Sequence, residues 1–265
     1  MKRPLAALAA VALLAVTTGC TAPAPVIGDG SETRSFTFDG DRLAIDSHNS
    51  SLQVTARDVD EVQVRRELTG TVVIGSDSAD WSLSGDRLNL ERQCTGLFSS
   101  CRTAYQVVVP LGVELDVSGR NGTIQVAQLD RSVDVTTRNG RVEVEEVAGD
   151  VFVKTNNGAI DVRGAESEVK TISRNGDVQV RDTSAEVLFV RTNNGSVDAQ
   201  LNAEPRNAEV ETRNGAVDLQ LPGGPYDVQV HTGNGSQRVN VPTDASSPRF
   251  VRVNTNNGAV TITSP

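Results

Sequence analysis

Apolar and polar residues alternate with a period of two through most of the chain, and Asn-Gly interrupts the alternation at nearly regular intervals. The positions six and four before each of these asparagines, and three and five after it, are almost always apolar. Around Asn139 they are Val133, Val135, Val142 and Val144. Such alternation places apolar side chains on one face of a strand, so each repeat is predicted to hold two strands joined by a constant corner.

The repeat is serial. Eight Asn-Gly pairs follow one another at spacings of 18, 18, 18, 19, 20, 20 and 23 residues, and Thr or Ser stands two places before the asparagine in every copy from Thr137 to Thr255. A degenerate copy surrounds Asn49, and the copy at Asn234 carries its valines two places late. The asparagines expected to form a structural ladder at the corner are Asn121, Asn139, Asn157, Asn175, Asn194, Asn214, Asn234 and Asn257.

Two architectures fit this pattern. Asn-Gly between alternating runs is typical of a hairpin turn, but eight successive hairpins would make a sheet of about sixteen strands with one apolar face to cover. A β-solenoid instead points the valines of both strands inward and stacks the coils about 4.8 Å apart. We therefore predict an all-β fold, a single-stranded β-helix-like solenoid with two short strands per 18–20-residue coil. An antiparallel β-meander is the alternative.

Two further features suit stacked coils. Only 3% of the residues are aromatic, which favours a thin core between β layers. The residue before the corner asparagine alternates between Arg and Asn from Arg138 to Arg213. In a stack this alternation keeps like charges about 9.6 Å apart, twice the strand spacing.

The N-terminus has the pattern of a secretory leader. Lys2 and Arg3 precede an apolar stretch that is too short to span a bilayer as a helix. The stretch ends in "TTGC", which resembles a bacterial lipoprotein cleavage box, although Thr17 stands where Leu is usual. We predict a lipoprotein signal peptide over residues 1–20 with lipidation at Cys20, a flexible tether over 21–33, and an extracytoplasmic protein anchored by lipid to the bacterial membrane. An ordinary signal peptide is the alternative.

Residues 34–115 are less regular and are predicted to form a β cap on the first coil, followed by the Asn-Gly solenoid over 116–265. Cys94 and Cys101 flank six residues within the cap. In an oxidising compartment this spacing favours a disulfide, since it matches no zinc motif.

Charge limits the partners. The net charge is −9, and loss of Lys2 and Arg3 with the leader would make it −11. An acidic surface argues against nucleic acid as a partner.

Candidate chemistry is sparse. Neither His48 nor His231 has partners at a metal or triad spacing, and the glycines lie in corners rather than before a helix. An outward column of acids, four places after the corner asparagine, is interleaved with glutamine and is read as a solvated face. The sequence therefore predicts no enzyme, no metal site and no cofactor.

The best binding candidate is a patch on the strands before the corner, where alternate residues should face outward. Its members are Phe152, Lys154, Lys170, Ile172, Phe189 and Arg191. Aromatic and cationic side chains together could contact a glycan or an envelope protein. The alternative is that the N-terminal region or a second copy covers this face.

The serial "RNGxVxV" and "TNNGxVxV" units from 118 to 263, with the weaker copy at 45–54, resemble the bacterial putative-adhesin family of β-strand-repeat domains. That resemblance implies a right-handed β-helix-like domain that is lipid- or membrane-anchored, and it implies no reaction. We expect a non-catalytic adhesion or binding scaffold. The alternatives are a carbohydrate-active envelope enzyme and an envelope-stress accessory protein acting through a protein partner.

Overall fold

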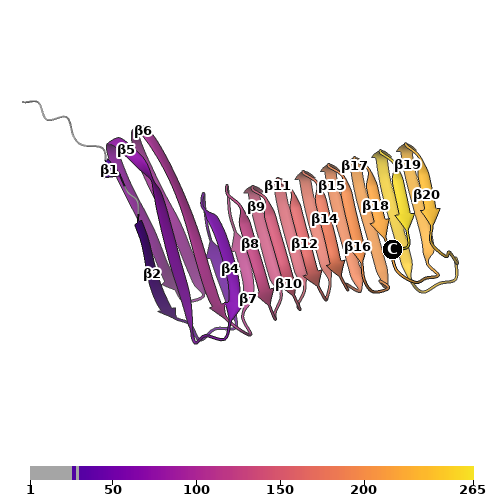
Figure 1. Cartoon of the computed structure of the whole chain (residues 1–265), viewed down its shortest axis with the longest axis horizontal. Coiled ribbons are helices and arrows are strands. Elements are labelled where there is room, and N and C mark those ends of the chain that lie inside the picture. Colours follow the sequence, from indigo (N-terminus) through magenta and orange to yellow (C-terminus); the bar gives the residue numbers. More distant parts are fainter. Residues whose placement is uncertain (1–25, 28–29) are drawn as a thin grey trace, which may run out of the picture.

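The computed structural model describes residues 26–27 and 30–265 (Figure 1). The predicted signal peptide and Cys20 lie outside these residues. All the secondary-structure elements in the described part of the chain are strands, β1 to β22. None of the described residues forms a helix that is long and apolar enough to span a bilayer.

Residues 114–263 form two parallel ladders in which each coil contributes one strand to each ladder. The strand before the Asn-Gly corner lies in one ladder, here called the odd sheet, and the strand after it lies in the other, the even sheet. In stacking order the odd sheet contains β7 (Glu114–Ser118), β9 (Val133–Asn139), β11 (Val151–Asn157), β13 (Val169–Asn175), β15 (Val187–Asn194), β17 (Asn207–Asn214), β21 (Phe250–Asn257) and β19 (Asp227–Asn234). The even sheet contains β8 (Ile124–Leu129), β10 (Val142–Val147), β12 (Ile160–Ala165), β14 (Val178–Thr183), β16 (Val197–Leu201), β18 (Val217–Gln220), β22 (Val260–Thr263) and β20 (Gln237–Asn240).

The inner faces of the two sheets carry the apolar columns. Val135 and Val144 of one coil are both fully buried, and so are Val153 and Val162 of the next. Parallel pairing aligns each valine with its equivalent one coil away, as Val144 is aligned with Val162. The predicted solenoid with two short strands per coil is therefore confirmed, and the antiparallel meander is wrong for this part of the chain.

The Asn-Gly corner is held by a continuous ladder of side-chain amides. Each asparagine after the first donates from Nδ2 to Oδ1 of the one before it, at 2.6–2.9 Å, in the stacking order Asn49, Asn121, Asn139, Asn157, Asn175, Asn194, Asn214, Asn257 and Asn234. The glycine that follows is required by close stacking. A Cβ on Gly158 would lie 1.9 Å from the carbonyl oxygen of Gly140. The predicted ladder of asparagines is confirmed.

The Thr or Ser two places before the asparagine also contributes to the corner. In the copies from Ser173 to Thr255 its hydroxyl donates to a glycine carbonyl of the neighbouring coil, whereas the hydroxyls of Thr137 and Thr155 are buried without a hydrogen-bond partner. Thr192 bonds the carbonyl of Gly176 at 3.2 Å, and Thr212 bonds that of Gly195 at 3.1 Å. Each such bond satisfies a carbonyl that the corner geometry leaves without a strand partner.

Stacking order and chain order differ at the C-terminus. β21 and β22, the last strands in the chain, lie between the coil β17–β18 and the coil β19–β20 (Figure 1). In space, the residues before the corner asparagine therefore read Arg213, Asn256, Gly233, so the Arg–Asn alternation runs one coil further than it does along the chain. The end of the stack is the coil that begins at Asp227.

The even strands carry a bulge near their ends that the alternation alone does not show. Gln128, Glu146 and Asp182 have positive φ angles of 62°, 55° and 52°, and Gly164 occupies the same place with φ 62°. A residue in this left-handed conformation breaks the period of two. Val147, which follows Glu146, consequently points inward and is buried.

A further coil precedes β7. β3 (Arg42–Asp46) pairs in parallel with β7, and β4 (Ser51–Arg57) pairs in parallel with β8. Asn49 between them accepts the first bond of the asparagine ladder. The degenerate copy in the sequence is thus a coil of the stack, within the region that the sequence assigns to an irregular cap.

The stack is closed at its N-terminal end by a long hairpin that folds back on itself. β5 (Glu61–Ser84) and β6 (Arg87–Pro110) pair antiparallel, while the start of β6 pairs with β3 and its end pairs with β4. Because β3 and β4 belong to opposite sheets, the hairpin must bend between these contacts. Trp81 and Tyr105, one from each arm, are buried inside the bend.

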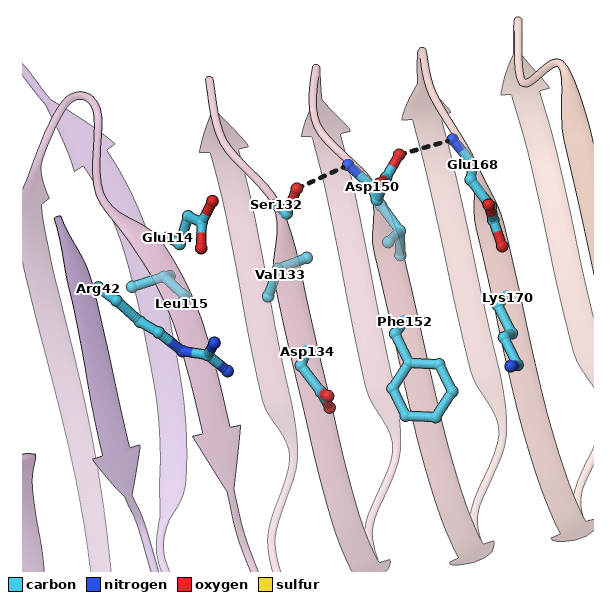
Figure 2. Close-up of a pocket in the computed structure, with 11 residues that line it drawn as sticks. Arg42, Glu114, Leu115, Ser132, Val133, Asp134, Asp150, Phe152, Glu168 and Lys170 are labelled. Atoms are coloured by element: carbon cyan, nitrogen blue, oxygen red, sulfur yellow. Dashed lines mark hydrogen bonds between the residues drawn. The ribbon is translucent and has the colours of Figure 1, made fainter.

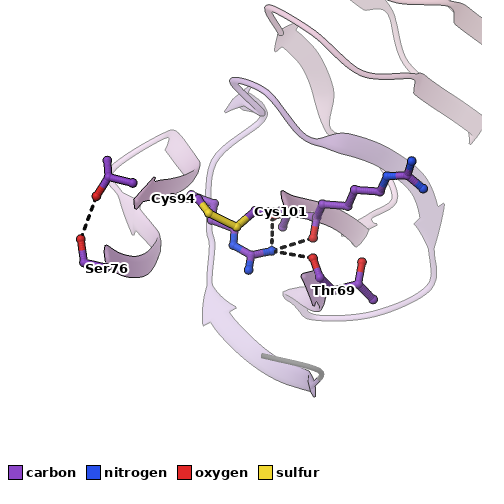
Figure 3. The surroundings of a disulfide bond; sticks show 8 residues. Thr69, Ser76, Cys94 and Cys101 are labelled. Atoms are coloured by element: carbon purple, nitrogen blue, oxygen red, sulfur yellow. Dashed lines mark hydrogen bonds between the residues drawn. A yellow bond between two sulfur atoms is a disulfide. The ribbon is translucent and has the colours of Figure 1, made fainter. Parts of the chain in front are cut away.

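The disulfide between Cys94 and Cys101 joins the two halves of strand β6 on either side of this bend (Figure 3). The two Cα atoms are 6.5 Å apart, whereas seven residues of extended strand reach roughly 23 Å. Arg92 reinforces the same bend by donating to the carbonyl oxygen of Arg102 at 2.7 Å. The predicted pairing is therefore present, and its place in the fold is a bent strand.

β1 (Val26–Ile27) and β2 (Gly30–Thr37) pair antiparallel with β5 at the outer edge of the hairpin. Residues 30–33, which the sequence assigns to the flexible tether, are therefore part of the sheet. Side-chain contacts fix β2 in place: Glu32 pairs with Arg66 at 2.8 Å, and Arg34 lies 4.4 Å from the centre of the Trp81 ring. The composition of this segment suggested a linker, but the unpaired edge of β5 gives its backbone hydrogen-bond partners.

Candidate functional site

The odd sheet presents the predicted patch on its outer face. Lys154 and Arg191 are exposed, and Phe152, Lys170, Ile172 and Phe189 are half-buried. The described part of the N-terminal cap therefore does not bury these side chains. In a chain without a second copy, this face is open.

Register brings the six residues into two rows that cross three coils. Phe152, Lys170 and Phe189 are direct neighbours on β11, β13 and β15, and so are Lys154, Ile172 and Arg191. The ammonium group of Lys170 lies 5.5 Å from the centre of the Phe152 ring and 5.7 Å from that of Phe189. The two rings thus hold one cation between them.

A third row, one place before the corner asparagine, extends the patch and was not among the predicted site residues. Asn156, Arg174 and Asn193 line the same hollow as Lys154, Lys170 and Phe189, and its volume is about 370 Å³. The nine residues are called the grid below: Phe152, Lys154, Asn156, Lys170, Ile172, Arg174, Phe189, Arg191 and Asn193. The Arg–Asn alternation was the sequence signal for this row, but we read it only as charge spacing within the stack.

The grid is positively charged, whereas the protein as a whole is negatively charged. It contains four cations and no carboxylate, in a chain of net charge −9. Of the three lysines in the sequence, Lys154 and Lys170 both lie here. Its one ion pair with a flanking coil runs from Arg191 to Glu211 at 3.5 Å, among the described residues.

A second hollow, of about 270 Å³, adjoins the grid on the side of β9 and β7 (Figure 2). Lys170 lines both hollows, and Phe152, its neighbour in the grid, lines the second. Asp134 and Arg42 point into the second one (Figure 2). Burial and the carboxylate of Asp116 one coil away raise the pKa of Asp134, against a weaker opposing hydrogen bond from Thr136.

Two other carboxylates in or beside this acidic hollow, those of Asp150 and Asp116, already have partners. Asp150 accepts from Ser167 Oγ at 2.5 Å and from the backbone nitrogen of Glu168 at 3.2 Å, so it shapes the corner between coils. Asp116 pairs with Arg42 at 3.5 Å. Asp116 and Asp150 are therefore not free to act together with Asp134.

Three acids of the column on the even sheet, Glu143, Asp161 and Asp198, are paired with arginines. Arg141 lies 2.6 Å from Glu143 and 3.7 Å from Asp161, and Arg181 lies 2.6 Å from Asp198. Within residues 26–27 and 30–265, no group of three or more His, Cys, Asp or Glu side chains is placed to hold a metal ion.

The histidines lie apart from the grid. His231 is exposed on the end strand β19, as its position in the repeat predicts. His48 contacts Asn89 at 2.9 Å and Asp46 at 3.7 Å in the N-terminal coil.

A search of curated proteins finds no match. Solved structures that match include a putative adhesin from Bacteroides fragilis NCTC 9343, with a TM-score of 0.44 and 11% identity over 90% of this chain and 98% of that chain. Another is a putative cell adhesion protein from Clostridium sporogenes ATCC 15579, with a TM-score of 0.32 and 8% identity over 90% of this chain and 100% of that chain.

The family model described as Toastrack DUF4097 matches residues 40–263. The match runs from just before β3 to the end of β22, so it includes the folded hairpin as well as every coil. It confirms the resemblance to a β-strand-repeat family that the "RNGxVxV" units indicated. The chain belongs to the Toastrack DUF4097 family.

Proposed function

We propose that this protein is a non-catalytic binding scaffold of the bacterial cell envelope, anchored through lipid on Cys20, and that its grid binds a glycan. The observation that carries this proposal is the pair of half-buried phenylalanines held on either side of Lys170 on an open sheet face. Aromatic rings on a rigid surface offer an apolar contact at little cost in side-chain entropy. Neighbouring asparagine and lysine side chains supply hydrogen-bond donors to hydroxyl groups.

The solenoid suits this role because it holds the side chains of the grid on a rigid backbone. β11, β13 and β15 are interior strands of the stack, each paired on both edges. The asparagine ladder joins their corners at 2.7 Å per bond. A surface preorganised in this way spends little free energy on ordering when a ligand binds.

A carbohydrate-active enzyme has one observation in its favour, which is the raised pKa of Asp134 in a hollow that also contains Arg42. Glycoside hydrolysis usually needs two carboxyl groups facing each other across the scissile bond. The Asp116 and Asp150 carboxylates are engaged in other contacts. We therefore favour binding without catalysis. Release of new reducing ends from a bound glycan, lost in Asp134→Asn, would contradict this choice.

The test is binding of the purified protein to an array of envelope and host glycans, with Phe152→Ala/Phe189→Ala as the variant. The matched control is Phe250→Ala, which removes a half-buried phenylalanine from β21 of the same sheet. We expect binding that the double variant loses and the control keeps. Binding that all three proteins share, or no binding by folded protein, would reject the grid as a glycan site.

The anchor is tested separately. Cys20→Ser should move the protein from the membrane to the soluble extracytoplasmic fraction, because one buried acyl chain or more would be lost. Unchanged membrane association would reject lipidation at Cys20.

A further inference from the structure

We infer that the ligand of the grid is an acidic polysaccharide, whose sugar rings contact the phenylalanines and whose carboxylates contact the cations. This inference rests on the proposed function, since it names the chemical class of ligand for the same surface.

The charge pattern favours an anionic ligand. Lys154, Lys170, Arg174 and Arg191 line the hollow, and no carboxylate lines it. Among the described residues, no salt bridge engages Lys154 or Arg174. Lys154, Lys170 and Arg174 are adjacent on one open face, and their charges repel one another unless an anion lies between them.

The acids around the grid define its limits. Along the row of Phe152, Lys170 and Phe189, the neighbour on β9 is Asp134 and the neighbour on β17 is Glu209. Glu209 pairs with Arg252 at 3.4 Å, further from the grid. The positive surface is therefore three strands wide and bounded by negative charge on both sides, which a diffuse polyanion-binding surface would not show.

The size of the grid argues for a narrow ligand. Two strand spacings and four residues of strand give roughly 10 Å by 13 Å, whereas a stable protein interface buries about 800 Å² on each partner. Protein interfaces also exclude charge from their centres, but Lys170 lies at the centre of this row, between two aromatic rings. A chain of sugars with carboxylates fits these dimensions better than a folded partner.

The rings argue for sugars over an acidic peptide or a simple anion. Phe152 and Phe189 flank Lys170 at nearly equal distances, so their exposed edges and faces lie on both sides of one positive charge. Asn156 and Asn193 add amides that can both donate and accept hydrogen bonds. Hydroxyl groups use both kinds of partner, and a carboxylate uses only donors.

The test is an equilibrium titration of the purified protein with polygalacturonate and with its full methyl ester, which keeps the sugar chain and removes the charge. Poly-glutamate and vesicles containing phosphatidylglycerol serve as the acidic peptide and the anionic lipid surface. We expect polygalacturonate to bind at least about tenfold more tightly than the other three, and added salt to weaken this binding. A negative protein repels polyanions elsewhere on its surface, so binding must be local.

The variant is Lys154→Gln/Lys170→Gln, and its matched control is Arg131→Gln/Arg238→Gln, which removes the same charge from two exposed positions outside the grid. We expect the first to weaken polygalacturonate binding about tenfold and the second to leave it within about twofold. Thermal unfolding of both variants verifies that the fold is retained.

Each other outcome overturns the inference in a distinct way. Equal binding of the methyl ester, lost in Phe152→Ala/Phe189→Ala, would leave a glycan site without the requirement for an acid. Tighter binding of poly-glutamate or of the vesicles would replace the glycan by that partner. If neither pair of grid variants changes any binding, then both the inference and the proposed function fail. If no probe binds, the inference fails and the glycan array decides the proposed function.

Discussion

Two coils of the stack carry nearly the same motif but differ in what they bury. The coil β15–β16 lies inside the stack, and its apolar side chains at Leu188, Val190 and Val197 are fully or almost fully buried. The coil β19–β20 lies at the end, where Val228 and Val230 are only half-buried and all four residues of β20 are exposed. Asn194 and Asn234 nevertheless both bond into the ladder.

The difference separates two parts of the repeat. The corner needs a neighbouring coil on one side only, because one amide bond and one stacked glycine are enough to hold it in place. The apolar columns need neighbours on both sides to be removed from water, so the end coil has polar Gln237 where interior coils have Val or Ile. The end coil therefore keeps the corner and gives up the core.

The largest effect should come from ending the chain at Pro248, which removes β21 and β22 from inside the stack. Val251, Val253, Val260 and Ile262 are buried there, and their loss should cost about 6 kcal/mol or more of local stability. Amide hydrogen exchange should show β19 and β20 unprotected while β15 stays protected. A chain ending at Thr263 is the control. Protection of β19 against β17 in the shorter chain would contradict the expectation.

A core substitution sharpens the comparison within one sheet. Val190→Ala in the interior coil should lower the free energy of unfolding by about 2–3 kcal/mol, because it leaves a cavity between two neighbouring coils. Val230→Ala in the end coil should cost less than about 1 kcal/mol, since its side chain is already partly in water. Urea denaturation measures both. Equal losses would mean that the end coil is as well packed as the interior.

The ladder offers a smaller contrast. Asn194→Ala breaks two amide bonds, one to Asn175 and one from Asn214, whereas Asn234→Ala breaks only the bond to Asn257. With each bond contributing on the order of 1 kcal/mol, we expect losses of about 2 and about 1 kcal/mol. The same denaturation series measures them, and a larger loss from Asn234→Ala would refute the additive view of the ladder.

The smallest effect concerns two carboxylates, those of Asp116 and Asp134, which stacking places next to each other on neighbouring coils. Burial and Asp116 raise the pKa of Asp134 in the folded chain, so the ionised form opposes folding. That cost is fully present above the folded pKa and disappears below the unfolded one. Asp134→Asn should therefore be more stable than the wild type at neutral pH, and the gap should close as the pH falls through the acidic range. Thermal unfolding at several pH values measures the gap, which should not widen in acid.

Much of the fold was predictable because its rules are local. The period of two placed Val133, Val142 and their equivalents inward, and the corner asparagines were found from their spacing. The bulge at Glu146 was missed, since nothing in the alternation marks a left-handed residue at a non-glycine position. The bend of the hairpin was missed for a different reason, because it depends on contacts of β6 with both β3 and β4.

The order of the last two coils was also missed, although the sequence held a signal. The copy at Asn234 is the least regular one after residue 118, and it lies at the end of the stack. A search that tied loss of apolar columns to an end position would have placed it there. The outward positions of Phe152 and Phe189 followed from periodicity, while the hollow that Phe189 shares with Arg174 needed the register between coils.

The insertion of the last coil has a consequence in time. Coils laid down in chain order could each pack as soon as they are made, but the place of β19 and β20 in the stack cannot be settled before β21 and β22 have been made. At a synthesis rate of about 5–20 residues per second, the segment after Asn234 takes roughly two to six seconds to follow. Until then, the place beside β17 and β18 that β21 and β22 must take is empty, and β19 and β20 lack the strands on which they pack. The protein therefore completes its stack only when the whole chain has been delivered, so a prematurely terminated chain has no native end.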